Sequence, residues 1–422
     1  MRLLTALFFS RKYWPVEDEI VQAIEIIKEN IGTQDVAVII NGDFSEVSQK
    51  NYDALVAVPM SGSVQPDMIH VAKKFKHIAL YAVYVQGSLP LEWTNRILCA
   101  NAAPTVMDVY GVLKRDLEKT VLLLNGHKAF LQYQRACRAY ERVKNGRLLM
   151  IGEPEPWVIS ISRNYEDYER NLGVSIVSAE QNELIELYHD TSFGEAEAVY
   201  QFFRKGAKCI FEPTNEDMIR CARMACALER LLQRYSAGGA SISCFNLIGQ
   251  TGVNPCIGVS HINSATDRFV ACEGDIDSAI TMLMMKELTD EKPWMANPIL
   301  MEDETITFSH CTAPFFVHGE SQAFTLRNHH ETSIGVSPCV SYRPGLQMTL
   351  LRYSGMLNTL TVNTGESLPT ELLPTCRTQL RIRLTDYHRF ISHVIGCHQV
   401  MTFENIEKEA KLLSELLHVK NT

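Results

Sequence analysis

Short apolar runs alternate with polar stretches of helical spacing in the N-terminal part of the chain, and this alternation constrains the fold more than any other feature. Runs of this length that are rich in Val, Ile and Leu are typical of buried parallel strands. Strands separated by single helices form right-handed crossover units, so the pattern predicts an open parallel sheet. The predicted strands are residues 3–9, 35–40, 54–58, 77–84 and 121–124, and the predicted helices include residues 16–30 and 66–75.

One loop of this predicted sheet is a candidate contact for a ligand. The residues Met60-Ser61-Gly62-Ser63 follow the strand 54–58. Ligands of open parallel sheets bind beyond the carboxyl ends of the strands, so Ser61 and Gly62 are candidate substrate-binding residues. The plainer alternative is a glycine-containing turn before a helix. The chain contains neither GxGxxG nor a P-loop motif, which leaves dinucleotide binding and P-loop chemistry without support.

A second α/β segment is expected to begin near Gly146. Its predicted strands include residues 148–151 and 174–177. A long helix is expected to start after Thr214, which has the spacing of a capping pair with Asp217, and to end at Gly238. Shorter helices are predicted at residues 179–188 and 195–205.

The pattern changes to closely spaced strands from Ser333 onward, and it returns to a helix at residues 403–417. Strands separated by Pro and Gly turns predict a mostly antiparallel sheet or barrel. We therefore expect an α/β protein with two parallel-sheet segments followed by a β-rich C-terminal domain. The predicted strands of that domain are residues 335–342, 346–352, 359–362 and 379–383. The expected domains are residues 1–145, 146–300 and 301–422, and the second of them carries Glu273.

Charge, hydropathy and cysteine spacing limit the expected partners and environment. The 40 Lys and Arg against 49 Asp and Glu give a net charge of −9 without a basic run, so nucleic acid is not an expected partner. No apolar run approaches the ~18 residues of a membrane helix, and Arg11 follows the apolar start too soon for a signal peptide. We expect a cytoplasmic protein with no membrane contact. Its 12 cysteines include no CxxC pair and are expected to be reduced and to serve mainly in packing.

Three residues combine metal-binding chemistry with positions at strand ends. Glu273 follows the strand-like run 269–272 and precedes a helix, which places a carboxylate where pockets form. His310 ends another strand-like run, and His398 lies in an apolar turn. A carboxylate with one or two imidazoles suits Mn²⁺, Fe²⁺ or Zn²⁺. The alternative is that Asp275 merely caps the helix and that Glu273 complements its dipole.

Four motifs resemble the L-fucose isomerase and L-arabinose isomerase superfamily, particularly its shorter fucose isomerase-like members. They are Cys-Glu273-Gly-Asp, His310-Cys-Thr, Cys376-Arg-Thr-Gln379 and Gly396-Cys-His398-Gln. The resemblance implies two Rossmann-like α/β segments followed by a β-rich domain. It also implies Mn²⁺-dependent interconversion of an aldose and a ketose through a cis-enediol, which is an intramolecular oxidoreductase reaction on a monosaccharide. The expected assembly is a homo-oligomer with shared active sites, in which one subunit's N-terminal segment covers the site of another.

The resemblance also assigns roles to individual residues. Glu273 matches the first family carboxylate, which is a metal ligand and an acid/base, and His398 matches the C-terminal ligand histidine. His310 matches the histidine of the His-Cys motif and is expected to contact substrate and take part in catalysis. The second family carboxylate falls at Asn297, which would then be the remaining metal ligand and catalytic position.

Asn297 is a departure from the family pattern, because an amide is a neutral oxygen ligand that carries no proton at neutral pH. Three hypotheses follow. Glu302 or Asp303 replaces the missing carboxylate in an active isomerase, or the protein is a catalytically impaired homologue that binds a sugar or metal. In the third hypothesis, the acidic and histidine clusters are surface and core residues of a fold kept for assembly.

Overall fold

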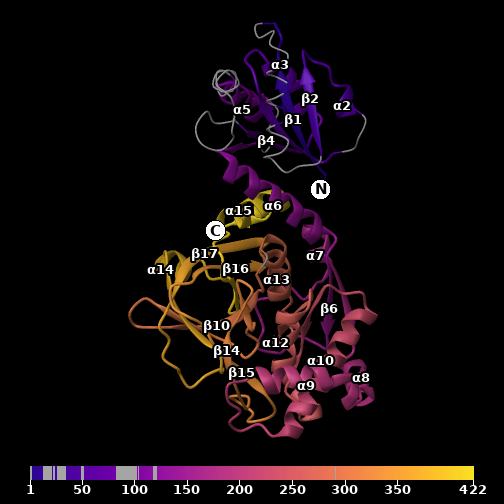
Figure 1. The fold of residues 1–422 in the computed structure, drawn as a ribbon, viewed down its shortest axis with the longest axis vertical. Coiled ribbons are helices and arrows are strands. Elements are labelled where there is room, and N and C mark those ends of the chain that lie inside the picture. The colour runs from indigo at the N-terminus through magenta and orange to yellow at the C-terminus, as the bar shows by residue number, and fades with distance from the viewer. Residues whose placement is uncertain are drawn as a thin grey trace. The chain divides into compact units, whose positions relative to one another are not determined.

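The structure is a computed structural model that describes residues 2–12, 21, 24–25, 35–48, 52–81, 102, 104–116, 121–289 and 291–422. The chain divides into two compact units, Met1–Tyr140 and Glu141–Thr422 (Figure 1). Most of the helix predicted at residues 16–30 and the end of the strand predicted at 77–84 lie outside the described residues. In the part of the chain that is described, no helix combines the length and the apolar character needed to cross a membrane.

The first unit contains the predicted open parallel sheet, with the strand order β2-β1-β3-β4-β5. Every residue of β3 and β4 is buried, as expected for central strands covered on both faces. The strands are β1 (Leu3–Phe9), β2 (Val36–Ile40), β3 (Ala54–Pro59), β4 (His77–Tyr81) and β5 (Val121–Leu124), and the described helices are α2 (Ser45–Ser48), α3 (Gln65–Ala72), α5 (Thr105–Asp116) and α6 (His127–Lys144), whose last residues belong to the second unit.

The second unit begins with another parallel sheet, of order β7-β6-β8-β9. The predicted capping pair is present, because Thr214 Oγ1 accepts a hydrogen bond from the Asp217 N–H and Asp217 accepts one from the Thr214 N–H. The strands are β6 (Arg147–Ile151), β7 (Ser175–Ala179), β8 (Gly239–Ile242) and β9 (Phe269–Cys272), and the helices are α7 (Glu166–Leu172), α8 (Gln181–Asp190), α9 (Phe193–Gly206), α10 (Asn215–Arg234), α11 (Cys244–Thr251), α12 (Cys256–Ala265) and α13 (Ile276–Leu288).

The C-terminal part of this unit is a closed antiparallel barrel of six strands, which confirms the β-rich expectation. It closes because β16 pairs with both β17 and β19. The barrel strands are β10 (Trp294–Leu300), β11 (Ile306–Ser309), β16 (Gln347–Ser354), β17 (Thr359–Leu368), β18 (Gln379–Leu384) and β19 (Gln399–Thr402). Around it lie β12 (Phe316–Val317), β13 (Glu320–Ser321), α14 (Tyr387–Ser392), α15 (Glu407–Leu417) and β20 (Lys420–Asn421).

Two details of the β-rich part differ from the prediction. The strand predicted at residues 335–342 is β15 (Ser337–Ser341), which pairs with β14 (Ala323–Arg327) in a separate hairpin and not with the barrel. The last helix begins at Glu407 rather than near Phe403, because β19 extends through Thr402 before the chain turns.

Helix α13 joins the second parallel sheet to the barrel. It packs against β8 and β9 of the sheet and against β10, β16 and β19 of the barrel. Its contact with β16 can be followed in Figure 1. Eleven of its residues are buried, on every side of the helix, as expected for an element enclosed by protein. The residues at its N-terminus therefore lie where the sheet and the barrel meet.

Candidate functional site

The turn between β9 and α13 directs the side chain of Glu273. Glu273 and Gly274 both have left-handed backbones, with φ of 62° and 66°. Such a conformation is strained for a non-glycine residue and persists only where the surroundings determine it. A Cβ on Gly274 would lie 2.4 Å from the Cα of Pro154, so the second position requires glycine. The N–H of Glu155 donates to the Glu273 carbonyl at 3.0 Å and holds the turn in place.

The structure brings Glu273, His310 and His398 together from distant parts of the sequence. Glu273 Oε1 lies 3.8 Å from His310 Nε2 and 3.4 Å from His398 Nε2. One ligand atom of each residue lies within 4.8 Å of the other two. His310 follows β11 and His398 precedes β19, and β10 lies between these two strands in the barrel. The barrel supplies two imidazoles and the parallel sheet supplies the carboxylate.

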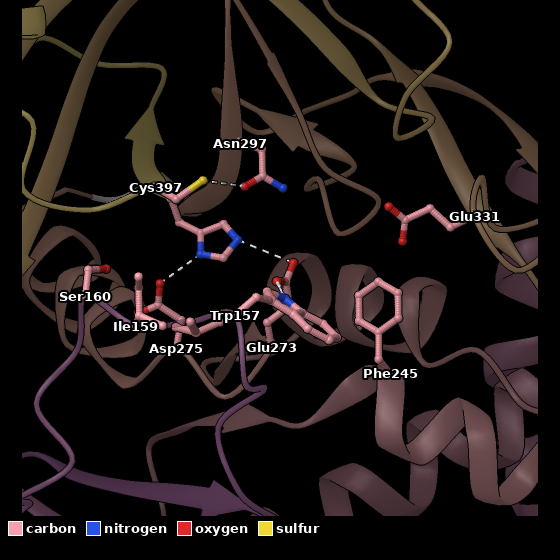
Figure 2. Close-up of a pocket in the computed structure, with 11 residues that line it drawn as sticks. Trp157, Ile159, Ser160, Phe245, Glu273, Asp275, Asn297, Glu331 and Cys397 are labelled. Carbon is pink, nitrogen blue, oxygen red and sulfur yellow. Dashed lines mark hydrogen bonds and ion pairs between the residues drawn. The ribbon is translucent and has the colours of Figure 1, made fainter.

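Glu273 and His398 line a cavity of about 600 Å³, whereas His310 is not part of its lining and lies behind it, 3.8 Å from Glu273. A cavity of this size is typical of small-molecule sites. The Trp157 indole N–H donates to Glu273 Oε2 at 2.8 Å, and its ring packs edge to face on Phe245. Glu331 and Phe245 lie at one end of the cavity, and Ile159 lies at the other (Figure 2). The cavity therefore has a carboxylate, imidazole and aromatic lining, which can take a small polar ligand with one apolar face.

Asp275 orients His398. Its Oδ2 atom lies 2.8 Å from His398 Nδ1 and 2.7 Å from Nη1 of Arg352, which is fully buried. The carboxylate can only accept these hydrogen bonds, so His398 donates from Nδ1 and its Nε2 atom faces Glu273. Among the described residues, this buried Nε2 has only the 3.4 Å contact with Glu273 and no hydrogen bond. A carboxylate that holds one ring nitrogen while the other faces a site is typical of histidine metal ligands.

The pKa values reflect this cluster of opposite charges. Burial favours the neutral form of His398, but hydrogen bonds and charge from Asp275 and Glu273 outweigh it and raise the pKa of His398 to about 9. Burial likewise raises the pKa of the Glu273 carboxyl, but His310 and His398 outweigh it and hold that pKa well below its usual range. Glu273 is therefore ionised at neutral pH and is an anionic ligand for a cation.

Asn297 lines the same cavity from the middle of β10. Its backbone position pairs with Ser309 of β11, the residue before His310. Its side-chain oxygen accepts a hydrogen bond from the Cys397 thiol at 3.2 Å. The amide thus lines the same cavity as Glu273 and His398.

The remaining predicted residues belong to the first unit or to other parts of the second unit. Ser61 is buried after β3 in the first unit, where its hydroxyl accepts from the Ser10 N–H at 2.7 Å and donates to the carbonyl of Gly62. Asp303 pairs with Arg381 at 2.5 Å and lines a different hollow, and Glu302 is exposed. Neither of these two acidic residues lines the cavity beside Glu273.

Sequence reasoning missed Trp157, Phe245, Glu331 and the orienting role of Asp275. Trp157 follows β6 in the segment Gly152–Trp157, and the rule that ligands lie beyond the carboxyl ends of strands could have indicated it. Glu331 lies in the connection between β14 and β15, where no sequence signal marks it. Asp275 does cap α13, as expected, since it accepts from the Ser278 N–H at 2.8 Å. Its bond to His398 depends on the fold.

In comparisons with known proteins, no family model and no curated protein matches the chain. The resemblance to sugar isomerases therefore stays a prediction that rests on the four motifs. The geometry of the cavity supports the proposals below.

The buried pair of Asp275 and Arg352 can be tested by Arg352→Met. The variant leaves Asp275 and Asp277 without their buried counter-charge, so we expect a loss of ~3–5 kcal/mol in the free energy of unfolding, measured by urea denaturation. Arg234→Met removes an exposed pair with Glu183 and should cost less than ~1 kcal/mol. Equal losses in the two variants would contradict the role given to Arg352.

The raised pKa of His398 predicts a pH dependence of stability in metal-free protein. The folded state binds the His398 proton more tightly than the unfolded state, whose pKa is near 6.5, so this stabilisation is complete below pH 6.5. It is lost as pH rises through about 9. We expect the free energy of unfolding to fall over this range more steeply in the natural protein than in His398→Gln. If the free energies of unfolding of the natural protein and of His398→Gln, measured by chemical denaturation, changed with pH in parallel, His398 would not be charged in the folded protein.

Proposed function

We propose that the protein is a metal-dependent sugar isomerase that interconverts an aldose and a ketose through a cis-enediol. The observation that carries this proposal is the convergence of Glu273, His310 and His398, of which Glu273 and His398 line one cavity of about 600 Å³. The motif resemblance supplies the reaction class, and the size and polar lining of the cavity fit a monosaccharide. Within the described part of the chain, the Nε2 atom of His398 makes no hydrogen bond and has only its 3.4 Å contact with Glu273, so it is open to a ligand bound between them.

The donor set suits Mn²⁺ or another divalent cation. Glu273, His310 and His398 would hold the ion, with the oxygen of Asn297 close to them on the cavity wall. A divalent ion bound there would polarise the carbonyl and neighbouring hydroxyl of a sugar and acidify the C–H between them. The identity of the sugar is left open by these residues.

The protein's own groups would bind the sugar and move the proton. The two oxygens of Glu273 have different partners, since Oε2 accepts from Trp157 and Oε1 faces the two histidines. Trp157 therefore fixes the carboxylate plane at the edge of the cavity, where the ionised group can accept a proton. The Trp157 and Phe245 rings provide an apolar surface on which the C–H face of a sugar can pack.

A second proton carrier is needed where the family pattern has a carboxylate and this chain has Asn297. Asp275 is engaged with Arg352 and His398 in the buried network. Apart from Glu273 and Asp275, Glu331 is the carboxylate among the described residues of the cavity lining, and this residue is exposed. We assign the second proton transfer to Glu331 in preference to Glu302 or Asp303, which do not line the cavity.

The second candidate function is a homologue that binds a sugar or metal without turnover. Asn297 favours it, because the amide stands at the position of a family carboxylate and its oxygen is already hydrogen-bonded to Cys397. In this case Glu273 and the two histidines would still bind a cation. The two functions differ in whether Glu331 can carry the second proton.

We also propose a cytoplasmic homo-oligomer with shared active sites. Trp157 and Ile159 are 54% and 80% exposed at the cavity, and a neighbouring subunit could cover these apolar side chains. The 11 cysteines that the structure describes are all free, which fits a reducing compartment.

Isomerisation assays with Mn²⁺ on a panel of aldoses and ketoses test the proposed function. We expect Glu273→Gln to lower the rate by at least ~10²-fold, because it removes both a ligand charge and a proton carrier. Glu331→Gln should lower it by a similar factor, whereas Glu302→Gln serves as the matched control and should leave it unchanged. Activity that is indifferent to Glu273 would contradict the site assignment.

The same assays separate the two candidate functions. A natural protein that retains Mn²⁺ but shows no turnover, together with a gain of activity in Asn297→Asp, would favour the binding homologue. Robust natural activity that requires Glu331 would favour the isomerase.

A further inference from the structure

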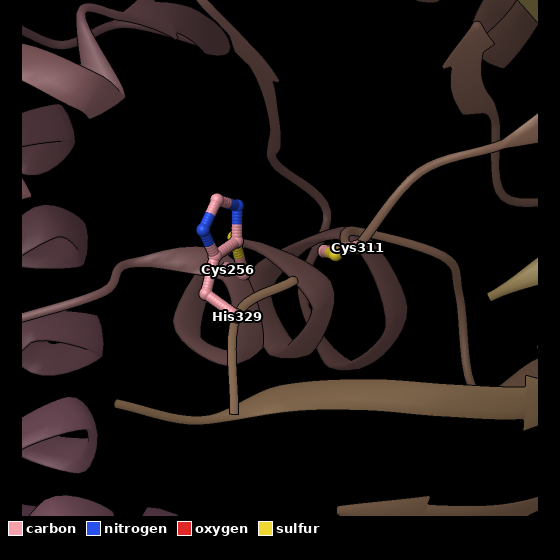
Figure 3. Close-up of side chains that lie close together, drawn as sticks. All are labelled: Cys256, Cys311 and His329. Atoms are coloured by element: carbon pink, nitrogen blue, oxygen red, sulfur yellow. The ribbon is translucent and has the colours of Figure 1, made fainter. Parts of the chain in front are cut away.

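A second cluster of metal-binding side chains lies outside the residues of the proposed isomerase site. Cys256 Sγ, Cys311 Sγ and a ring nitrogen of His329 all lie within 4.8 Å of one another (Figure 3). Their exposed fractions are 4%, 1% and 6%. Cys256 begins α12, Cys311 follows β11, and His329 lies between β14 and β15, so three separate elements supply the cluster.

A fourth donor adjoins these three. Cys311 shares side-chain hydrogen bonds with both Cys256 and Cys376, so its sulfur lies between two other thiols. The backbone N–H of Arg377 also donates to the Cys311 sulfur at 3.5 Å. The fold thus collects three sulfurs and one imidazole, although the sequence contains no CxxC pair.

His329 is fixed by contacts within its own connection. Its Nδ1 atom lies 3.1 Å from Thr332 Oγ1 and accepts a hydrogen bond from the Thr332 N–H at 3.4 Å. These contacts hold the buried ring in one orientation beside the two thiols. A disulfide between two of the thiols would not require a buried imidazole, whereas a metal site would use it as a ligand.

We propose that Cys256, Cys311, Cys376 and His329 form a structural site for a soft divalent cation of the zinc class. Three thiolates and one imidazole are a ligand set that favours tetrahedral zinc and not the hard cations bound by oxygen. Zn–S bonds of ~2.3 Å and Zn–N bonds of ~2.0 Å place the ligand atoms of such a site about 4 Å apart. Cys256, Cys311 and His329, whose ligand atoms already lie within 4.8 Å of one another, reach that spacing by small rotations. Cys376 lies outside this group of three and would have to turn toward the ion.

The site would connect the segment of His310, a residue of the proposed isomerase cluster, to the segment of Glu331, which lines the cavity. Cys311 directly follows His310, and His329 precedes Glu331 by two positions. An ion bound by these donors would link the end of β11 and the β14–β15 connection to α12. It would thereby hold the segments of His310 and Glu331 against the parallel-sheet part of the second unit. The inference goes beyond the proposed isomerase, because its donors are different residues with softer chemistry.

Cobalt titration tests this site without relying on enzyme activity. Metal-free protein would be prepared with a chelator in the background Glu273→Gln with His398→Gln, so that the isomerase cluster is disabled, and then titrated with Co²⁺. We expect the charge-transfer absorption of cobalt–thiolate bonds to saturate at one ion per chain and to disappear when Zn²⁺ is added. Absence of that absorption, in this background and in the natural protein, would overturn the proposal.

Ligand variants in the same background locate the ion. Cys256→Ser and His329→Gln should each lower Co²⁺ affinity by at least ~10²-fold, since loss of an outer partner alone costs 10–100-fold. Cys221→Ser is the matched control, because Cys221 is a buried thiol on α10 that bonds to the Asn254 carbonyl and is not one of the clustered donors. If Cys256→Ser does not fold, His329→Gln still gives the answer.

Two further results would overturn the proposal. One is an undiminished cobalt–thiolate absorption in His329→Gln. The other is an intramolecular disulfide among Cys256, Cys311 and Cys376 in protein isolated without reductant, detected by peptide mass spectrometry. A protein that shows the cobalt absorption but no isomerase activity would support the soft-metal site and count against the proposed function alone.

Discussion

The buried carboxylate of Asp275 is the interaction on which the rest of the site depends. It caps α13, accepts from Arg352 of β16 and orients His398 before β19. Three buried polar groups from the parallel-sheet part and the barrel thus share one acceptor. Burying these charges is costly unless their partners are present, so the network favours the position of the barrel against the sheet that keeps Arg352 and His398 in contact with Asp275.

The network continues into the core beneath the site. Tyr168 on α7 donates to Asp277 at 2.6 Å, and Asp277 lies 3.8 Å from Arg352. Burial raises the pKa of Asp277 to about 7, with Arg352 opposing this effect and Asp275 adding to it. Arg352 is therefore the counter-charge of two buried carboxylates, Asp275 and Asp277. Of these two, only Asp275 also bonds to His398, which lines the cavity.

Much of the fold could be predicted because its signals are local. Each parallel strand of the first unit is a continuous apolar run, and four of the six barrel strands also gave strand-like patterns. The barrel strand β10 was missed because Asn297 and Pro298 interrupt its apolar pattern, although both lie within the strand. Glu273, His310 and His398 could be singled out by residue type and strand-end position. Trp157, Glu331 and the gathering of Cys256 and Cys311 around His329 depend on contacts between distant segments, which no local pattern encodes.

The central claim is that Glu273, His310 and His398 bind a divalent cation, and anomalous diffraction from crystals grown with Mn²⁺ tests it most directly. The account predicts an anomalous peak in the cavity at ~2.0–2.3 Å from a Glu273 oxygen and from Nε2 of each histidine. A well-ordered cavity with no peak there, or Mn²⁺ bound only by other residues, would contradict it.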